Sequence, residues 1–187
     1  MSKNRKGSEQ ELYKSYPLSS IILYDGITIV HYILGGLGIT IAYSFFEYSY
    51  IIGLVYFTFA MIQMYVLMPI TVCPSCVYHR MKEGICISGL NKISRGSVME
   101  RPLEEFEKRS KGILSPNNLY MAALIIPVPA IIPGLIIDFQ FLPFLLLTAV
   151  VLLMLFRILV IFPKIACIHC MARYRCPNAR QMGLDLK

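Results

Sequence analysis

The chain has 187 residues, of which 56% are hydrophobic and only 16% are charged, and it carries a formal net charge of +7. A chain this short cannot bury so much apolar surface in one core, so the composition excludes an ordinary soluble domain and predicts a small integral membrane protein. Basic residues that flank membrane segments and contact the lipid bilayer's anionic head groups account for the charge, so no nucleic-acid partner is expected.

Four stretches are long and apolar enough to cross a bilayer as helices, which takes about 20 residues. The expected fold is all-α: a polytopic membrane protein whose four transmembrane helices form two hairpins. The predicted spans run from about Ile21 to Ser44, from Tyr50 to Ile70, from Leu119 to Ile137 and from Leu142 to Phe162.

The polar segments around these spans divide the chain into five parts. We expect a cytoplasmic N-terminal tail, a first hairpin, a cytoplasmic loop, a second hairpin and a cytoplasmic C-terminal tail. These parts cover residues 1–16, 17–76, 77–116, 117–170 and 171–187.

The distribution of Lys and Arg predicts the orientation, since basic flanks stay on the cytoplasmic side. Of the 18 Lys and Arg residues, 17 lie in residues 1–16, 77–116 and 163–187, and none lies in the short connections near Glu47 and Asp138. Both termini and the middle loop are therefore expected in the cytoplasm, with the protein in the cell membrane.

Six cysteines follow the cytoplasmic ends of the second and fourth spans, where thiols are normally kept reduced and disulfides are not expected. They form two similar sets, each with a proline that is expected to end the span, a Cys-x-x-Cys pair and a third cysteine. Three matched pairs are each 94 positions apart: Pro69 and Pro163, Cys73 and Cys167, Cys76 and Cys170. This offset predicts that the two hairpins are a parallel repeat. The candidate metal ligands are Cys73, Cys76, Cys86, Cys167, Cys170 and Cys176.

Two arrangements of zinc ligands are compatible with this pattern. A Cys-x-x-Cys turn can aim two thiolates at one ion, so the two pairs together could hold one tetrahedral zinc and bridge the hairpins. Alternatively, each set of three cysteines holds its own centre, with His79, three residues after Cys76, completing the first. His169 lies between two ligands and is poorly placed to bind the same ion.

An iron–sulfur cluster is the second cofactor that the cysteines predict, because the last set ends in Cys176-Pro177 and a Cys-Pro closes cysteine runs in ferredoxin-type sites. This stretch resembles the membrane subunits that pass quinol electrons toward periplasmic nitrate and nitrous-oxide reductases. The resemblance implies an electron-transfer subunit that links a cytoplasmic donor to a quinone or a partner enzyme. The chain departs from that family because it has no Cys-x3-Cys-Pro pair and no complete ferredoxin run of four cysteines.

The whole layout, four spans with "CPSC" and "CIHC" each followed by a third cysteine, is more similar to small four-span membrane proteins with paired cytoplasmic cysteine clusters. That resemblance covers most of the chain and implies no particular activity. No nucleotide loop, catalytic carboxylate pair or nucleophile triad is visible, so no catalytic activity of its own is expected. Two functions follow: a non-catalytic subunit that docks a protein at the cytoplasmic face, or the electron-transfer subunit. Redox-active, palmitoylated or idle thiols are the remaining alternative.

Three polar residues within the predicted spans need an explanation. Asp25 and Arg157 lie at comparable depths in the first and fourth spans. One possibility is an ion pair between them. The simpler expectation is that the Arg157 side chain extends to the cytoplasmic surface. His31 lies deeper and is the only histidine in a predicted span, which excludes a haem ligated by two histidines of this chain. A role in quinone binding or proton relay is one alternative, and a hydrogen-bonded packing residue is the simpler expectation.

Small residues and prolines predict how the spans pack. Close helix contact is expected in the first span, at Gly35, Gly36 and Gly38. A bend is expected in the third span, at Pro127, Pro129 and Pro133. In the middle loop, "RPLEEFEKRSKGIL" predicts a membrane-surface helix, a docking segment or a solvated helix with apolar residues at Leu103, Phe106 and Ile113.

Overall fold

The structure, a computed structural model, describes residues 11–108, 111–112 and 114–184. Within this part the chain is helical and contains no strand, apart from one isolated bridge that pairs Tyr13 with Cys170. Residues 1–10 of the predicted N-terminal tail, Ile113 of the middle loop and the last three residues lie outside the described part.

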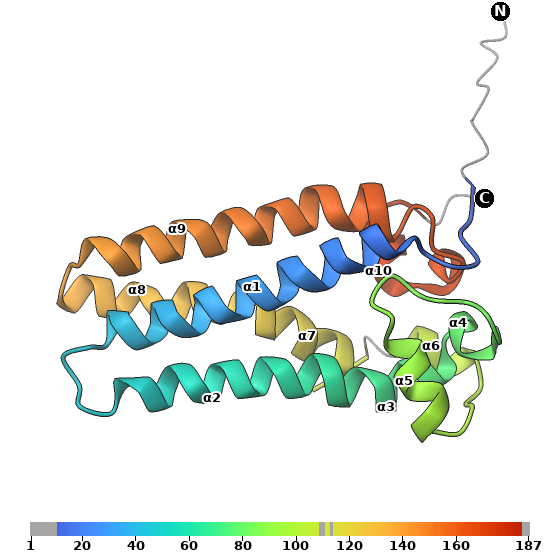
Figure 1. Ribbon diagram of the computed structural model, residues 1–187, viewed down its shortest axis with the longest axis horizontal. Helices are drawn as coiled ribbons and strands as arrows, with labels where there is room; N and C mark the ends of the chain where they lie inside the picture. Colours follow the sequence, from blue (N-terminus) through green and yellow to red (C-terminus); the bar gives the residue numbers. More distant parts are fainter. Residues whose placement is uncertain (1–10, 109–110, 113, 185–187) are drawn as a thin grey trace, which may run out of the picture.

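Four helical stretches are long and apolar enough to cross a membrane, so the prediction of an all-α chain with four helices of spanning length is confirmed. They lie side by side in Figure 1, with the two short connections at one end and both ends of the described chain at the other. Their bounds are Leu18–Ala42, Ser49–Ser75, Pro116–Ile137 and Phe141–Ala166.

The first stretch is a single helix, α1 (Leu18–Ala42), whereas wide turns or prolines divide the other three. The second contains α2 (Ser49–Ile62), the π-helix η1 (Gln63–Leu67), α3 (Met68–Thr71) and the 3-10 helix η2 (Cys73–Ser75). The third contains α7 (Pro116–Ile125) and α8 (Pro127–Ile137), and the fourth contains α9 (Phe141–Phe156) and the π-helix η3 (Arg157–Ala166).

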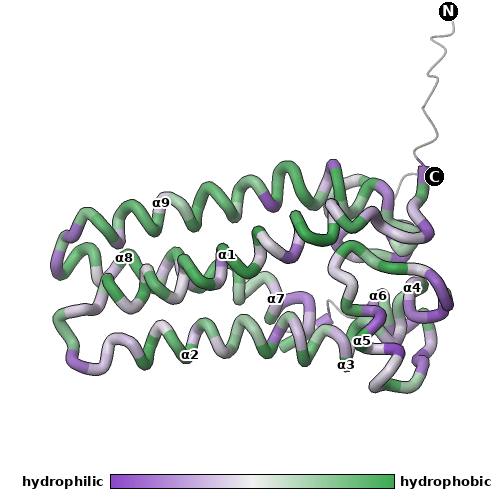
Figure 2. Tube along the Cα trace, viewed as in Figure 1, coloured by the Kyte–Doolittle hydropathy of each residue, from purple (hydrophilic) through white to green (hydrophobic). Residues whose placement is uncertain are grey.

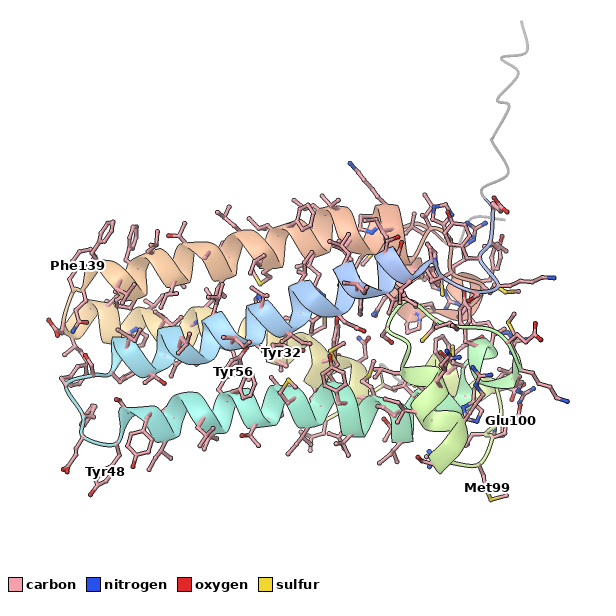
Figure 3. The ribbon with its side chains drawn as sticks, viewed as in Figure 1. Tyr32, Tyr48, Tyr56, Met99, Glu100 and Phe139 are labelled. Atoms are coloured by element: carbon pink, nitrogen blue, oxygen red, sulfur yellow. The ribbon has the colours of Figure 1, made fainter. Side chains whose placement is uncertain are left out.

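Short helices gather at the end opposite the two short connections, where Figure 2 shows more hydrophilic residues than along the four long helices. In Figure 3, Met99 and Glu100 lie at this end, whereas Tyr48 and Phe139 lie at the other. The short helices are α4 (Val77–Arg80), α5 (Leu90–Ser97), α6 (Glu104–Lys108), η4 (Arg173–Arg175) and α10 (Pro177–Gln181).

The expectation that Pro69 and Pro163 end their spans is wrong, because the helices continue past both prolines. A proline in an α-helix clashes with the carbonyl one turn earlier, and a wider turn moves that carbonyl away. The π-helix η1 directly precedes α3, which holds Pro69, and Pro163 lies inside η3. At the end of η3 the Cys167 N–H donates to the Phe162 carbonyl, five residues back, at 2.7 Å.

Helix α1 packs against α2, α8 and α9, and its glycines allow these approaches as the sequence predicts. A Cβ built on Gly36 would lie 3.3 Å from the carbonyl oxygen of Gly53, and one on Gly53 would lie 2.5 Å from that of Gly36. A Cβ on Gly38 would lie 2.7 Å from the side chain of Ile131 in α8. The absence of side chains at these glycines therefore sets the distance between helices.

The predicted break in the third span lies between α7 and α8, and side chains from other helices bind the carbonyls that it exposes. Pro127 has no N–H to donate to the Ala123 carbonyl, which accepts instead from the Tyr56 hydroxyl at 2.9 Å. The buried His31 Nε2 lies 3.0 Å from the Leu124 carbonyl oxygen, to which it must donate. The expectation that His31 is a hydrogen-bonded packing residue is confirmed. Tyr56 is labelled in Figure 3.

The short helix α6 in the middle loop packs inward. Its Phe106 side chain is buried in a cluster with Val72, Ala172 and Ala179. This segment is therefore not a helix that is solvated on all sides. Its Phe106 side chain packs against the segments that carry the cysteines.

Candidate metal centre

Each Cys-x-x-Cys pair closes one tight turn at the end of a spanning stretch. The Cys76 N–H donates to the Cys73 carbonyl at 3.0 Å, and the Cys170 N–H donates to the Cys167 carbonyl at 3.2 Å. In a turn closed over three residues the first and last side chains lie on the same side. The same local geometry therefore occurs at matched positions of the two hairpins.

All six cysteines line one cavity of about 160 Å³ at the hydrophilic end of the bundle. The two sets come from different hairpins, so packing of the hairpins brings together side chains that are far apart in sequence. The remaining wall is mainly apolar and includes Met68, Val72, Phe106, Phe162, Ala166 and Met182. The structure thus gathers in one place the six sulfur ligands that the sequence proposes.

The thiols lie close enough to affect one another's ionisation. Burial raises the pKa of the Cys170 thiol, and negative charge on Cys76, Cys176 or Cys167 would raise it further. The repelling groups belong to both cysteine sets. A cation bonded to the sulfurs would remove this repulsion, as metal binding to deprotonated thiols does.

The cysteines are not joined in disulfides. Among the described residues, no three or more His, Cys, Asp and Glu side chains are arranged as a ready-made site for one metal ion. The six cysteines therefore line a shared cavity without forming such a site among the described residues. This arrangement differs from the four-thiolate zinc site that the spacing suggests, in which sulfurs lie about 2.3 Å from one ion.

Two polar residues, the buried Asn91 and the half-buried Arg95, hold the loop that carries Cys86. The Cys86 N–H donates to Asn91 Oδ1 at 3.0 Å, and Asn91 Nδ2 donates to the carbonyls of Tyr78 and Gly84 at 3.1 and 2.8 Å. Arg95 also donates to the Gly84 carbonyl, at 2.7 Å. These bonds fold the loop back so that the third cysteine of the first set reaches the cavity.

His79, the seventh predicted ligand, does not line the cysteine cavity. It is buried, its Nδ1 lies 3.3 Å from the Ser94 hydroxyl, and burial lowers its pKa. His169 also lies away from the cavity wall, where its Nδ1 is 2.8 Å from the Glu11 carbonyl oxygen. The structure therefore brings the six cysteines together without either histidine.

The described part of the N-terminal tail lies across the second cysteine pair. The Tyr13 N–H donates to the His169 carbonyl at 2.9 Å, and the Tyr16 hydroxyl donates to the Ala166 carbonyl. The Tyr78 hydroxyl, next to the first pair, donates to the Tyr13 carbonyl at 2.6 Å. The tail thus ties the two cysteine sets to each other.

The inner end of the cavity lies within the spanning stretches, where Tyr24 and Tyr120 form part of its wall. Their hydroxyl oxygens are 3.0 Å apart. Behind them lies Arg157, whose side chain is only 1% exposed and which donates to the Tyr120 and Thr28 hydroxyls. Its guanidinium carbon lies 4.5 Å from the centre of the Tyr24 ring.

The expectation that Arg157 extends to the cytoplasmic surface is wrong, because its Nη1 and Nη2 donate to hydroxyl groups inside the bundle. The alternative of an ion pair with Asp25 is not formed either, although the structure describes both residues. One carboxylate oxygen of Asp25 is buried and has no hydrogen-bond partner in the part of the chain that the structure describes. Tyrosine and threonine hydroxyls take the role that the sequence analysis gave to a carboxylate.

Sequence reasoning missed Tyr24, Tyr120 and Thr28 because it searched for acidic partners only. A usable signal was present, since a buried arginine needs several acceptors and hydroxyl side chains occur at a similar depth in the first and third spans. The chain has 12 tyrosines and no tryptophan. A search for hydroxyl groups at the depth of Arg157 would have found them.

Comparison of the chain with protein-family models, curated proteins and solved structures finds no match in any of the three. The function is therefore argued from the residues of this site.

Proposed function

We propose that this protein is a membrane subunit that holds an iron–sulfur centre in the cavity lined by its six cysteines. The observation that supports the proposal most directly is the meeting of both cysteine sets at one largely apolar cavity. Thiolate ligands in apolar surroundings are what such clusters require, and burial and hydrogen bonding then tune their potential.

The number of cysteines at the cavity favours a cluster over a single zinc ion. One zinc draws four sulfurs into a tetrahedron around a point, and no three candidate ligands among the described residues are arranged in this way. A cluster fills the space between its thiolates with its own iron and sulfide atoms, so its ligands lie farther apart. The chain also supplies more cysteines than one zinc ion binds.

The role that fits this centre is electron transfer between a protein donor in the cytoplasm and a membrane-bound acceptor. The centre would lie at the hydrophilic end, within reach of a soluble partner, while the cavity extends inward to Tyr24 and Tyr120. This role requires no catalytic side chains beyond the ligands of the centre. A non-catalytic subunit with a structural metal is the outcome if the centre proves to be zinc.

The test of the metal is its colour. Protein purified without oxygen is expected to be brown, to absorb visible light and to contain iron and acid-labile sulfide. A colourless protein that contains zinc would contradict the proposal, because zinc has a filled d shell and no visible absorption. Element analysis of the same sample is the control for partial loss of the metal.

The proposed orientation places the cysteine end in the cytoplasm of a cell whose plasma membrane holds the four helices. It is supported by the distribution of basic residues along the sequence, because 17 of the 18 Lys and Arg residues lie in residues 1–16, 77–116 and 163–187, the segments expected to be cytoplasmic. A membrane-impermeant thiol reagent should therefore label no cysteine in intact cells, and should label some after permeabilisation and metal removal. Labelling of Cys73 or Cys167 from outside would reverse the orientation.

A further inference from the structure

The inner end of the cysteine cavity carries a hydrogen-bond donor for which the described residues supply no acceptor. Tyr24 and Tyr120 share one hydrogen bond, at 3.0 Å between their oxygens, and Arg157 Nη2 donates to the Tyr120 hydroxyl. A guanidinium only donates, so it uses none of the phenolic protons. Of the two phenolic protons, one forms the hydrogen bond between the two hydroxyl oxygens, whichever tyrosine donates it. The described residues offer no acceptor for the other proton.

The surroundings of this spare proton define the ligand that it can bind. The wall near the two tyrosines is mostly apolar and includes Met68 and Phe162. The Arg157 guanidinium carbon lies 5.4 Å from the centre of the Phe162 ring, as well as over the Tyr24 ring, and the side chain is almost fully buried. A ligand therefore meets phenols polarised by the cation, and an anion gains no direct contact with the guanidinium.

We propose that the head group of a membrane quinone binds at the inner end of this cavity, with a carbonyl oxygen accepting the spare proton of the Tyr24–Tyr120 pair. A quinone combines a flat apolar ring with two carbonyl acceptors, which matches an apolar wall with one donor. Both tyrosines belong to spanning helices, α1 and α7, at a depth where a lipid-soluble ligand is available.

The inference rests on the proposed function for its electrons, because the cysteines line the same cavity as the tyrosines. Reduction of a quinone to a quinol takes two electrons and two protons, and the protons would come from water at the hydrophilic end of the bundle. The six cysteines would hold a cluster that supplies one electron at a time, so a one-electron protein donor in the cytoplasm would be needed twice for each quinone. Oxidation of a quinol follows the same steps in reverse.

Binding of decylubiquinone tests the site. The full chain in lipid nanodiscs is titrated by calorimetry, with empty nanodiscs as the reference for quinone that dissolves in lipid. We expect saturable binding to the wild type. Tyr24→Phe or Tyr120→Phe alone leaves one phenol with a spare proton, so each should change the affinity less than about threefold. The double variant removes the donor and should weaken binding about tenfold, the size of one hydrogen bond.

Tyr32→Phe is the matched control, because Tyr32 lies in the same helix as Tyr24, is buried and does not line the cavity. Its hydroxyl has no partner among the described residues. The affinity of this variant should equal that of the wild type. Infrared spectroscopy gives a second measurement: the carbonyl stretch of the bound quinone should lie at a lower frequency than that of quinone in lipid.

Three results would overturn the inference. They are the absence of saturable binding beyond that of empty nanodiscs, equal affinity of the wild type and the folded double variant, and an unshifted carbonyl stretch in the wild type. The last result decides the matter if the double variant does not fold. Iron analysis separates this inference from the proposed function. If the protein contains no iron but binds quinone, the quinone site is supported and the iron–sulfur cluster is contradicted. If the protein is brown but does not bind quinone, the cluster is supported and the quinone site is contradicted.

Discussion

Replacing Cys73 and Cys76 together by serine is expected to remove all of the bound metal. Both cysteines line the same cavity as Cys167 and Cys170, so a centre in that cavity depends on ligands from both hairpins. Serine keeps the size of the side chain but is a poor ligand for iron or zinc. The measurement is the metal content per chain of purified protein, together with its visible spectrum.

The matched control is Ser75→Ala, which changes a buried residue of the same turn that does not line the cavity. It removes a hydrogen bond to the Val72 carbonyl, 3.1 Å long, and leaves every thiol in place, so the metal content should be unchanged. Replacing Cys167 and Cys170 together should have the same effect as replacing the first pair. If either double variant keeps half of the metal, the chain holds two independent centres and the shared site is wrong.

The lengths of the apolar segments and the spacing of residues within them predicted the number of spanning helices and the points of close helix contact. Four apolar stretches of spanning length became four helices, and the glycines in the first span became points of close contact. The constant offset between the cysteine pairs predicted that each pair lies at the same end of its hairpin. Because the two hairpins pack side by side in the same direction, the two pairs meet at one cavity. These features follow from chain length and side-chain volume, which are properties of local sequence.

Two other features could not be predicted in this way. The rule that proline ends a helix assumes α-helical winding, and the wide turns at η1 and η3 remove the clash on which that rule depends. The direction in which the Arg157 side chain points could not be predicted either. Residues 141–156, which precede Arg157, are apolar on every face, so their pattern does not show which side of the helix faces the bundle. Depth can be read from the sequence, but rotation about the helix axis depends on the neighbouring helices.

Replacing Arg157 by lysine is expected to destabilise the protein more than replacing it by methionine. The planar guanidinium donates to Tyr120 and Thr28 together and stacks over Tyr24, whereas an ammonium cannot reproduce this arrangement. Lysine would keep a buried cation with too few acceptors, which costs about 3 kcal/mol or more. Methionine removes the cation and fills similar space, and the Tyr24–Tyr120 bond remains.

Thermal unfolding of the purified variants in one detergent measures this order, with the wild type as the reference. If Arg157 extended to the membrane surface, lysine would be the milder change, because a long cationic side chain can do the same. Equal stability of the lysine variant and the wild type would therefore contradict the buried position. A double-mutant cycle identifies the partner: coupling between Arg157→Met and Tyr120→Phe should exceed that between Arg157→Met and Asp25→Asn, because the hydroxyl accepts a hydrogen bond from Arg157 and no ion pair joins it to Asp25.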